Sequence, residues 1–68
     1  MTKEEANIIV KRFGANWEVV GVNTIGVKHM ITCRNPRVVP GYNFHFTAIL
    51  LYNSKMDRVV NITIEQEA

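Results

Sequence analysis

The first residues of the chain carry apolar side chains at helical spacing. Positions i, i+3, i+4 and i+7 form one stripe, which comprises Ala6, Ile9, Val10 and Phe13. Thr2 and Glu5 have the spacing of a capping box, in which each side chain satisfies a free amide at a helix start. Gly14 is expected to end the helix in a left-handed conformation. These signals predict a helix over residues 3–13.

After Gly14 the apolar period changes from 3.6 to 2. Four segments rich in β-branched and aromatic residues are typical of strands: 17–23, 24–33, 42–52 and 57–66. Asn23-Thr24 is predicted to form the first turn and the polar run 53–56 the last. One helix followed by four strands predicts a single α+β domain over residues 1–68, most simply a meander (αββββ) with the helix on one face. The strand order stays open, because a rearranged sheet has the same linear pattern.

The face of this sheet away from the helix should be polar at every second position, and the sequence meets that expectation only in part. If the aromatic side of segment 42–52 faces the helix, four apolar residues remain uncovered: Met30, Ile49, Leu51 and Val59. Such a grouping often marks a contact surface. The alternative is that they are scattered single residues, which are normal on any surface. A helix of this length is about 16 Å long, so it can barely cover one face, which favours an interface.

Size and composition favour self-association. Chains of about this length bury only about 60% of their unfolded surface and often need a disulfide, a metal or a second subunit. The 68 residues include one cysteine, Cys33, so an internal disulfide is impossible. Cys33, His29 and His45 lack the spacing of a zinc site, and no cofactor is expected. By elimination we expect a homodimer, formed through the uncovered sheet face.

The N-terminal residues, the single cysteine and the longest apolar run indicate where in the cell the protein is located. The N-terminal MTKEEANIIV carries charge where a secretory signal needs apolar length, and the single cysteine favours a reducing, cytoplasmic setting. The longest apolar run, residues 48–52, is far shorter than the ~20 residues that cross a bilayer. We therefore expect a protein without a membrane-spanning segment.

The segment CRNPRVVPGYNFHF, residues 33–46, is a candidate anion-binding loop. Arg34 and Arg37, with Lys28, could bind phosphates while Tyr42 stacks on a base, which indicates nucleic-acid or nucleotide binding. In the alternative interpretation the two prolines mark turns and the arginines are solvated. The net charge is only +2, and strong duplex binders make six or more phosphate contacts. We favour the second interpretation.

No catalytic set stands out. Ser54 lies in a polar turn without a nearby histidine, and Cys33 beside His45 would be a buried thiol that behaves as a small hydrophobe. His29 is expected to be partly buried with a backbone partner. We therefore predict a non-enzymatic protein that binds another macromolecule. Chains of this length without a catalytic set often serve as accessory or inhibitory proteins, for instance in bacteriophages.

Overall fold

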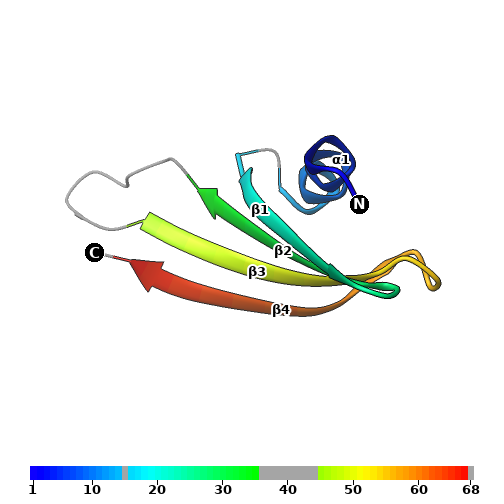
Figure 1. The fold of residues 1–68 in the computed structure, drawn as a ribbon. Helices are drawn as coiled ribbons and strands as arrows, with labels where there is room; N and C mark the ends of the chain where they lie inside the picture. The colour runs from blue at the N-terminus through cyan, green and yellow to red at the C-terminus, as the bar shows by residue number, and fades with distance from the viewer. Residues whose placement is uncertain (15, 36–44, 68) are drawn as a thin grey trace.

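A computed structural model of the protein describes residues 1–14, 16–35 and 45–67. It contains one helix and four strands: α1 (Lys3–Phe13), β1 (Glu18–Ile25), β2 (Lys28–Asn35), β3 (His45–Asn53) and β4 (Arg58–Glu67). The strands form one antiparallel sheet in the order β1-β2-β3-β4 (Figure 1). The predicted αββββ meander is confirmed.

Helix α1 begins where the capping box predicts. The backbone N–H of Glu5 donates to Oγ1 of Thr2 at 3.1 Å, and the backbone N–H of Thr2 donates to Oε1 of Glu5 at 3.2 Å. Two free amides of the helix start are thereby satisfied. The hydrogen bonds from Thr2 favour the ionised carboxylate and lower the pKa of Glu5.

Gly14 ends α1, but for a different reason from the expected one. Its backbone is extended, with φ −169° and ψ 127°, so the predicted left-handed conformation is wrong. Its N–H donates to the carbonyl of Val10 at 2.8 Å and closes the last turn. A Cβ at this position would lie 2.6 Å from Cδ1 of Trp17, so close approach of the Trp17 ring explains the glycine. That ring also packs against Phe13, with 6.2 Å between ring centroids.

The first hairpin turns at Gly26-Val27, and the predicted turn at Asn23-Thr24 is wrong. Gly26 has φ +61°, which suits the first central position of a two-residue hairpin. Strand β1 instead continues through Asn23 and Thr24 to Ile25. Ile25 at the end of β1 and Val27 in the turn are both exposed.

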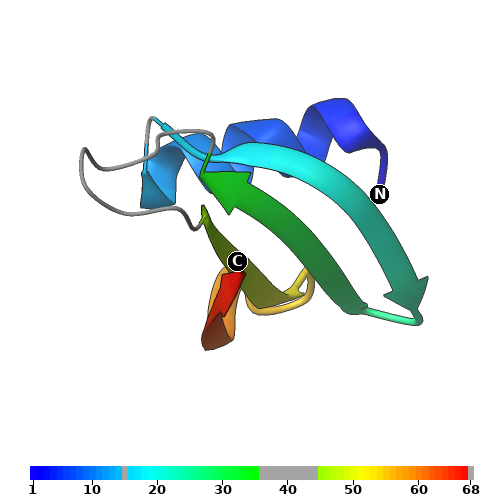
Figure 2. The ribbon, with the colours of Figure 1, turned by 90° about the vertical axis from the view of Figure 1, so that its left-hand side faces the viewer.

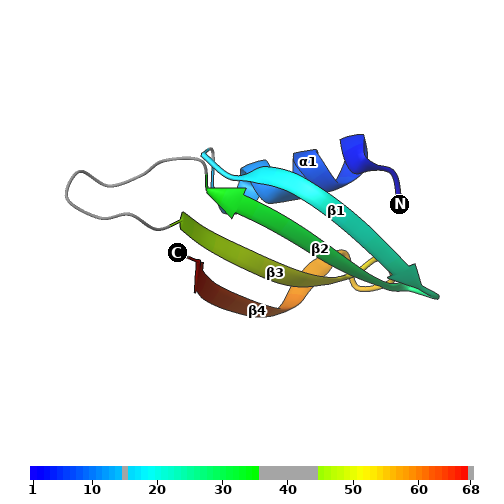
Figure 3. The ribbon, with the colours of Figure 1, turned by 60° about the vertical axis from the view of Figure 1, so that its left-hand side comes forward.

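Helix α1 packs against the β1 side of the sheet, which defines an inner face toward the helix and an outer face away from it (Figures 2 and 3). The fully buried residues lie between α1 and the inner face: Ala6, Val10, Ile31, Cys33, Ala48 and Leu50. The predicted inner face of β3 is confirmed for Ala48, Leu50 and Tyr52, whereas Tyr42 and Phe44 lie outside the described residues. Strand β4 lies at the sheet edge farthest from β1, in the views of Figures 1 and 3.

An irregularity in β4 changes the face on which one predicted residue lies. Leu51 pairs with Asn61 and the next residue, Tyr52, pairs with Val59, so Val60 has no direct partner in β3. This bulge places Val59 on the inner face, where it packs against the core. The expected position of Val59 on the outer face is therefore wrong, because strict alternation along β4 ignores the extra residue.

Candidate functional site

The outer face contains a hollow of about 310 Å³ near the turn between β1 and β2. Met30 and Leu51 pair directly across β2 and β3, so their side chains lie side by side on this face. Asn23 lies opposite Met30 on the neighbouring strand β1. The residues that line this outer-face hollow are Asn23, Ile25, Lys28, Met30 and Leu51.

The apolar side chains of the outer-face hollow are open to solvent. Met30 is 42% exposed and Ile25 is 76% exposed, while Leu51 is half-buried. Ile49 is also half-buried and lies one row farther along, opposite Thr32. Three of the four residues expected on this face are thus found on it. Ile25 was missed, although Gly26 was the signal: a two-residue turn beginning at that glycine extends β1 through Ile25.

Two cationic residues, Lys28 and Arg58, lie at the same end of the outer face as the hollow. Lys28 lines the hollow and pairs with Asn53, which in turn pairs with Arg58. Directly opposed residues share a face, so Lys28 and Arg58 both lie on the outer face, and both are exposed. The acidic residues Glu18 and Glu65 of the outer face lie toward the other end of the described strands. Lys28 therefore places a positive charge at the rim of the hollow, whereas Arg58 lies one strand farther away and does not line it.

The structure separates the described part of the predicted anion site. Lys28 and Arg34 lie on one strand and one face, but six residues apart, which is about 20 Å at ~3.3 Å per residue. Arg34 also lies opposite the acidic residue Glu18 of β1. Arg37 and Tyr42 lie outside the described residues. Lys28 and Arg34 do not converge on one ligand.

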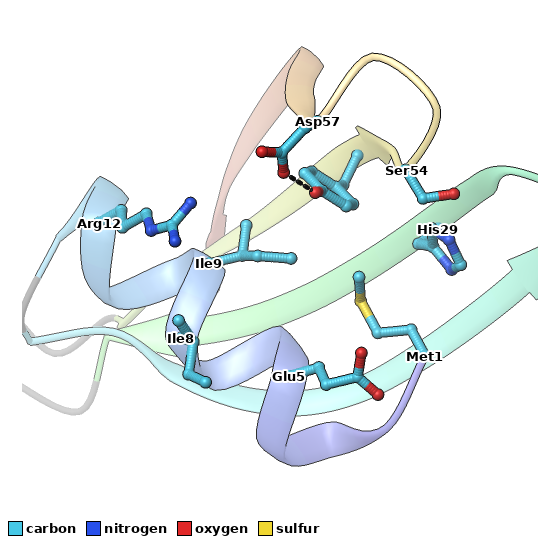
Figure 4. A pocket seen from close by; sticks show the side chains of 9 residues that line it. Met1, Glu5, Ile8, Ile9, Arg12, His29, Ser54 and Asp57 are labelled. Atoms are coloured by element: carbon cyan, nitrogen blue, oxygen red, sulfur yellow. Dashed lines mark hydrogen bonds between the residues drawn. The ribbon is translucent and has the colours of Figure 1, made fainter.

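A second hollow, of about 370 Å³, lies between α1 and the inner face (Figure 4). The helix contributes Glu5 and Arg12, and the sheet contributes His29. Ser54 and Asp57 come from the segment between β3 and β4. Both signs of charge therefore meet in this inner-face hollow.

Most polar side chains of the inner-face hollow already bond to the protein itself. Nδ1 of the buried His29 lies 2.8 Å from the hydroxyl of Thr24, a side-chain partner in place of the expected backbone one. The Tyr52 hydroxyl donates to the carboxylate of Asp57, and this hydrogen bond raises the pKa of Tyr52. The Ser54 hydroxyl donates to the carbonyl of Val27 at 3.2 Å and ties the two hairpin ends together. His29, Ser54 and Asp57 of this hollow thus each have a hydrogen-bond partner within the protein.

The candidate nucleophile Cys33 is fully buried on the inner face. Its thiol donates to the carbonyl of Ala48 at 3.4 Å, and burial raises its pKa, which disfavours the reactive thiolate. Cys33 pairs with Ala48, so the register does not bring it opposite His45. The geometry is that of a core residue.

Comparisons with known proteins add no assignment. No protein family model, curated protein or solved structure matches this chain. In the part of the chain that the structure describes, no group of three His, Cys, Asp or Glu residues could hold a metal ion. The same part contains no helix long and apolar enough to cross a membrane. Function is therefore inferred from the surfaces of the sheet.

Proposed function

We propose that the protein is a small non-enzymatic binding module that docks a protein partner on the outer face of its sheet. The observation that carries this proposal is the outer-face hollow, where Met30 and Leu51 form an apolar floor that is open to solvent. An apolar side chain of a partner would displace water from that floor, at ~25 cal/mol per Å² of apolar surface removed from water. Interfaces concentrate their binding energy in such central apolar contacts.

The outer face is large enough for a specific but small interface. Its strands are 8 to 10 residues long, about 26–33 Å at ~3.3 Å per residue, and four strands spaced ~4.8 Å span about 19 Å, so the face has an area of roughly 500–600 Å². A standard protein interface buries about 800 Å² on each partner, so a partner that covers the outer face would form a contact at the small end of the specific range.

The charge beside the hollow indicates the chemistry of the partner. Lys28 lines the hollow next to the apolar floor, so the partner is expected to present an apolar side chain with a carboxylate next to it. Complementary charge of this kind increases the association rate and selects the orientation of docking. The apolar contact itself should be nearly independent of salt.

The test compares two methionines that differ in position but little in exposure. Met30 is 42% exposed on the outer face, and Met56 is 54% exposed in the segment between β3 and β4. Immobilised wild-type protein, Met30→Lys and Met56→Lys are each incubated with an extract of the cells that express the protein, once with and once without nuclease. We expect wild type and Met56→Lys to retain the same stoichiometric protein, and Met30→Lys to lose at least about nine-tenths of it, a tenfold weakening.

Two outcomes would overturn the proposal. Equal retention by Met30→Lys would show that the outer-face hollow is not the contact. If nuclease removed every captured protein, and if Arg34→Glu with Arg37→Glu abolished nucleic-acid recovery, the function would move to nucleic-acid binding. That alternative further predicts binding that weakens steeply as salt rises.

A further inference from the structure

The free edge of β4 is complementary to itself, and we propose that two copies of the protein pair along it. β4 is the last strand in the sheet order, so among the described strands its only neighbour is β3. The outward backbone groups of an edge strand form a template for another strand. The proposed pairing is antiparallel and joins the two four-stranded sheets into one.

The register with β3 assigns each β4 side chain to a face. Ile62 pairs with Leu50 and therefore shares the inner face with it, while Asn61 pairs with Leu51 on the outer face. Val60 is the bulge residue. On the inner face lie Val59, Ile62 and Ile64, and on the outer face lie Arg58, Asn61, Thr63 and Glu65.

If a two-fold axis passes through Ile62, the apolar residues of one β4 strand lie opposite apolar residues of the other, and polar residues lie opposite polar residues. Ile62 then lies opposite Ile62 of the second copy, and Asn61 lies opposite Thr63. Beyond the bulge, Val59 lies opposite Ile64 of the second copy. Because the bulge takes up one extra residue at Val60, apolar residues still meet on the inner face after it, and polar residues still meet on the outer face.

The same register brings opposite charges together. The next pair after Val59 and Ile64 places Arg58 opposite Glu65 of the second copy, on the outer face. Symmetry forms this pair twice, once at each end of the contact. Opposite charges directly across an antiparallel pair are stabilising, and like charges are destabilising. The charge pattern therefore favours this register and the antiparallel direction.

The proposed contact along β4 would cover apolar side chains that are exposed in the single molecule. Leu50 and Ala48 are fully buried, yet their partners Ile62 and Ile64 are 41% and 55% exposed on the same inner face. The difference arises because α1 packs against the β1 side of the sheet. An antiparallel pairing keeps both inner faces on one side, so each Ile62 gains an apolar cross-strand neighbour.

The other edge of the sheet does not offer this complementarity. Strand β1 carries one charged residue, Glu18, so no symmetric pairing of β1 with itself can join opposite charges. Pairing along β4 also leaves the outer-face hollow open. Self-association was expected from the sequence to use the outer face itself. The edge contact instead lets a dimer form while each copy binds a partner.

Cysteine cross-linking tests the register. Residues opposed in an antiparallel pair have Cα atoms about 4.5–5.5 Å apart, within the range of a disulfide. Ile62→Cys should therefore form a covalent dimer under mild oxidation at micromolar protein. Thr63→Cys is the matched control, because the two thiols introduced by that substitution would be offset along the strands and out of reach. The native Cys33 is buried and does not compete. Failure of Ile62→Cys to cross-link, or equal cross-linking by Thr63→Cys, overturns the proposal.

Charge reversal provides a second test on exposed residues, which leaves the core unchanged. Sedimentation equilibrium gives the dimer dissociation constant for wild type, Arg58→Glu, Glu65→Arg and the double variant. Each single reversal should weaken the dimer roughly tenfold, because like charges then meet at both ends. The double variant restores opposite pairs and should return to within about threefold of wild type. A wild-type protein that stays monomeric, or a double variant no better than the singles, contradicts the pairing.

Discussion

Replacing Gly14 by alanine should destabilise the protein through a clash with Trp17. The new Cβ would lie 2.6 Å from Cδ1 and 3.0 Å from Nε1 of that ring. Overpacking of this kind costs about 1–3 kcal/mol. The backbone of Gly14 is extended, so alanine would otherwise gain about 0.4–1 kcal/mol by restricting the unfolded chain. The net loss should be about 1–2 kcal/mol, from a total of about 3–10 kcal/mol for a chain of this length.

Urea unfolding followed by far-ultraviolet circular dichroism measures this loss in four variants. Gly21→Ala is the control, because a Cβ there meets nothing within 4 Å, and its stability should be unchanged or slightly higher. In a Trp17→Leu background the cost of Gly14→Ala should disappear. An equal cost in both backgrounds would refute the clash and place the strain in the backbone of Gly14.

Three further predictions concern single side chains. Thr2→Ala should lower the free energy of unfolding by about 1 kcal/mol and raise the pKa of Glu5 toward its usual value, as NMR titration would show; an unchanged Glu5 pKa would contradict the capping box. Because the folded-state pKa of Tyr52 is raised, its stabilising effect is present below about pH 10 and is lost as pH rises through the raised value. Tyr52→Phe should therefore be less stable at pH 7 and decline less at alkaline pH, and a parallel decline of both proteins would refute the role of Asp57. The buried Cys33 should react with a thiol reagent only as fast as the protein unfolds, so rapid labelling in native buffer would contradict its burial.

The helix could be predicted because its signals are local. The capping box is complete between Thr2 and Glu5, and the predicted start at Lys3 is confirmed. The end at Phe13 is also confirmed, but the role of Gly14 depends on Trp17, which approaches only after the chain has turned toward β1. Sequence spacing alone does not contain that contact.

The faces of the strands were predictable only where pairing is regular. Met30, Ile49 and Leu51 were placed correctly because β2 and β3 pair without a shift. Val59 lies on the inner face because the bulge at Val60 shifts the pairing by one residue, which reverses the faces of the residues before it and leaves those after it as strict alternation predicts. The first turn lies at Gly26 and not at the polar pair Asn23-Thr24, because Gly26 adopts the positive φ that the turn requires without a steric cost.

The central claim, that a protein partner docks in the outer-face hollow, is tested most directly by NMR mapping. Isotope-labelled protein is titrated with the partner recovered by capture, and the backbone amide shifts are followed residue by residue. We predict that the largest changes occur at Met30 and Leu51, with little change at Arg12 of the inner-face hollow. Changes centred on Arg12 and His29, with Met30 and Leu51 unmoved, would contradict the claim.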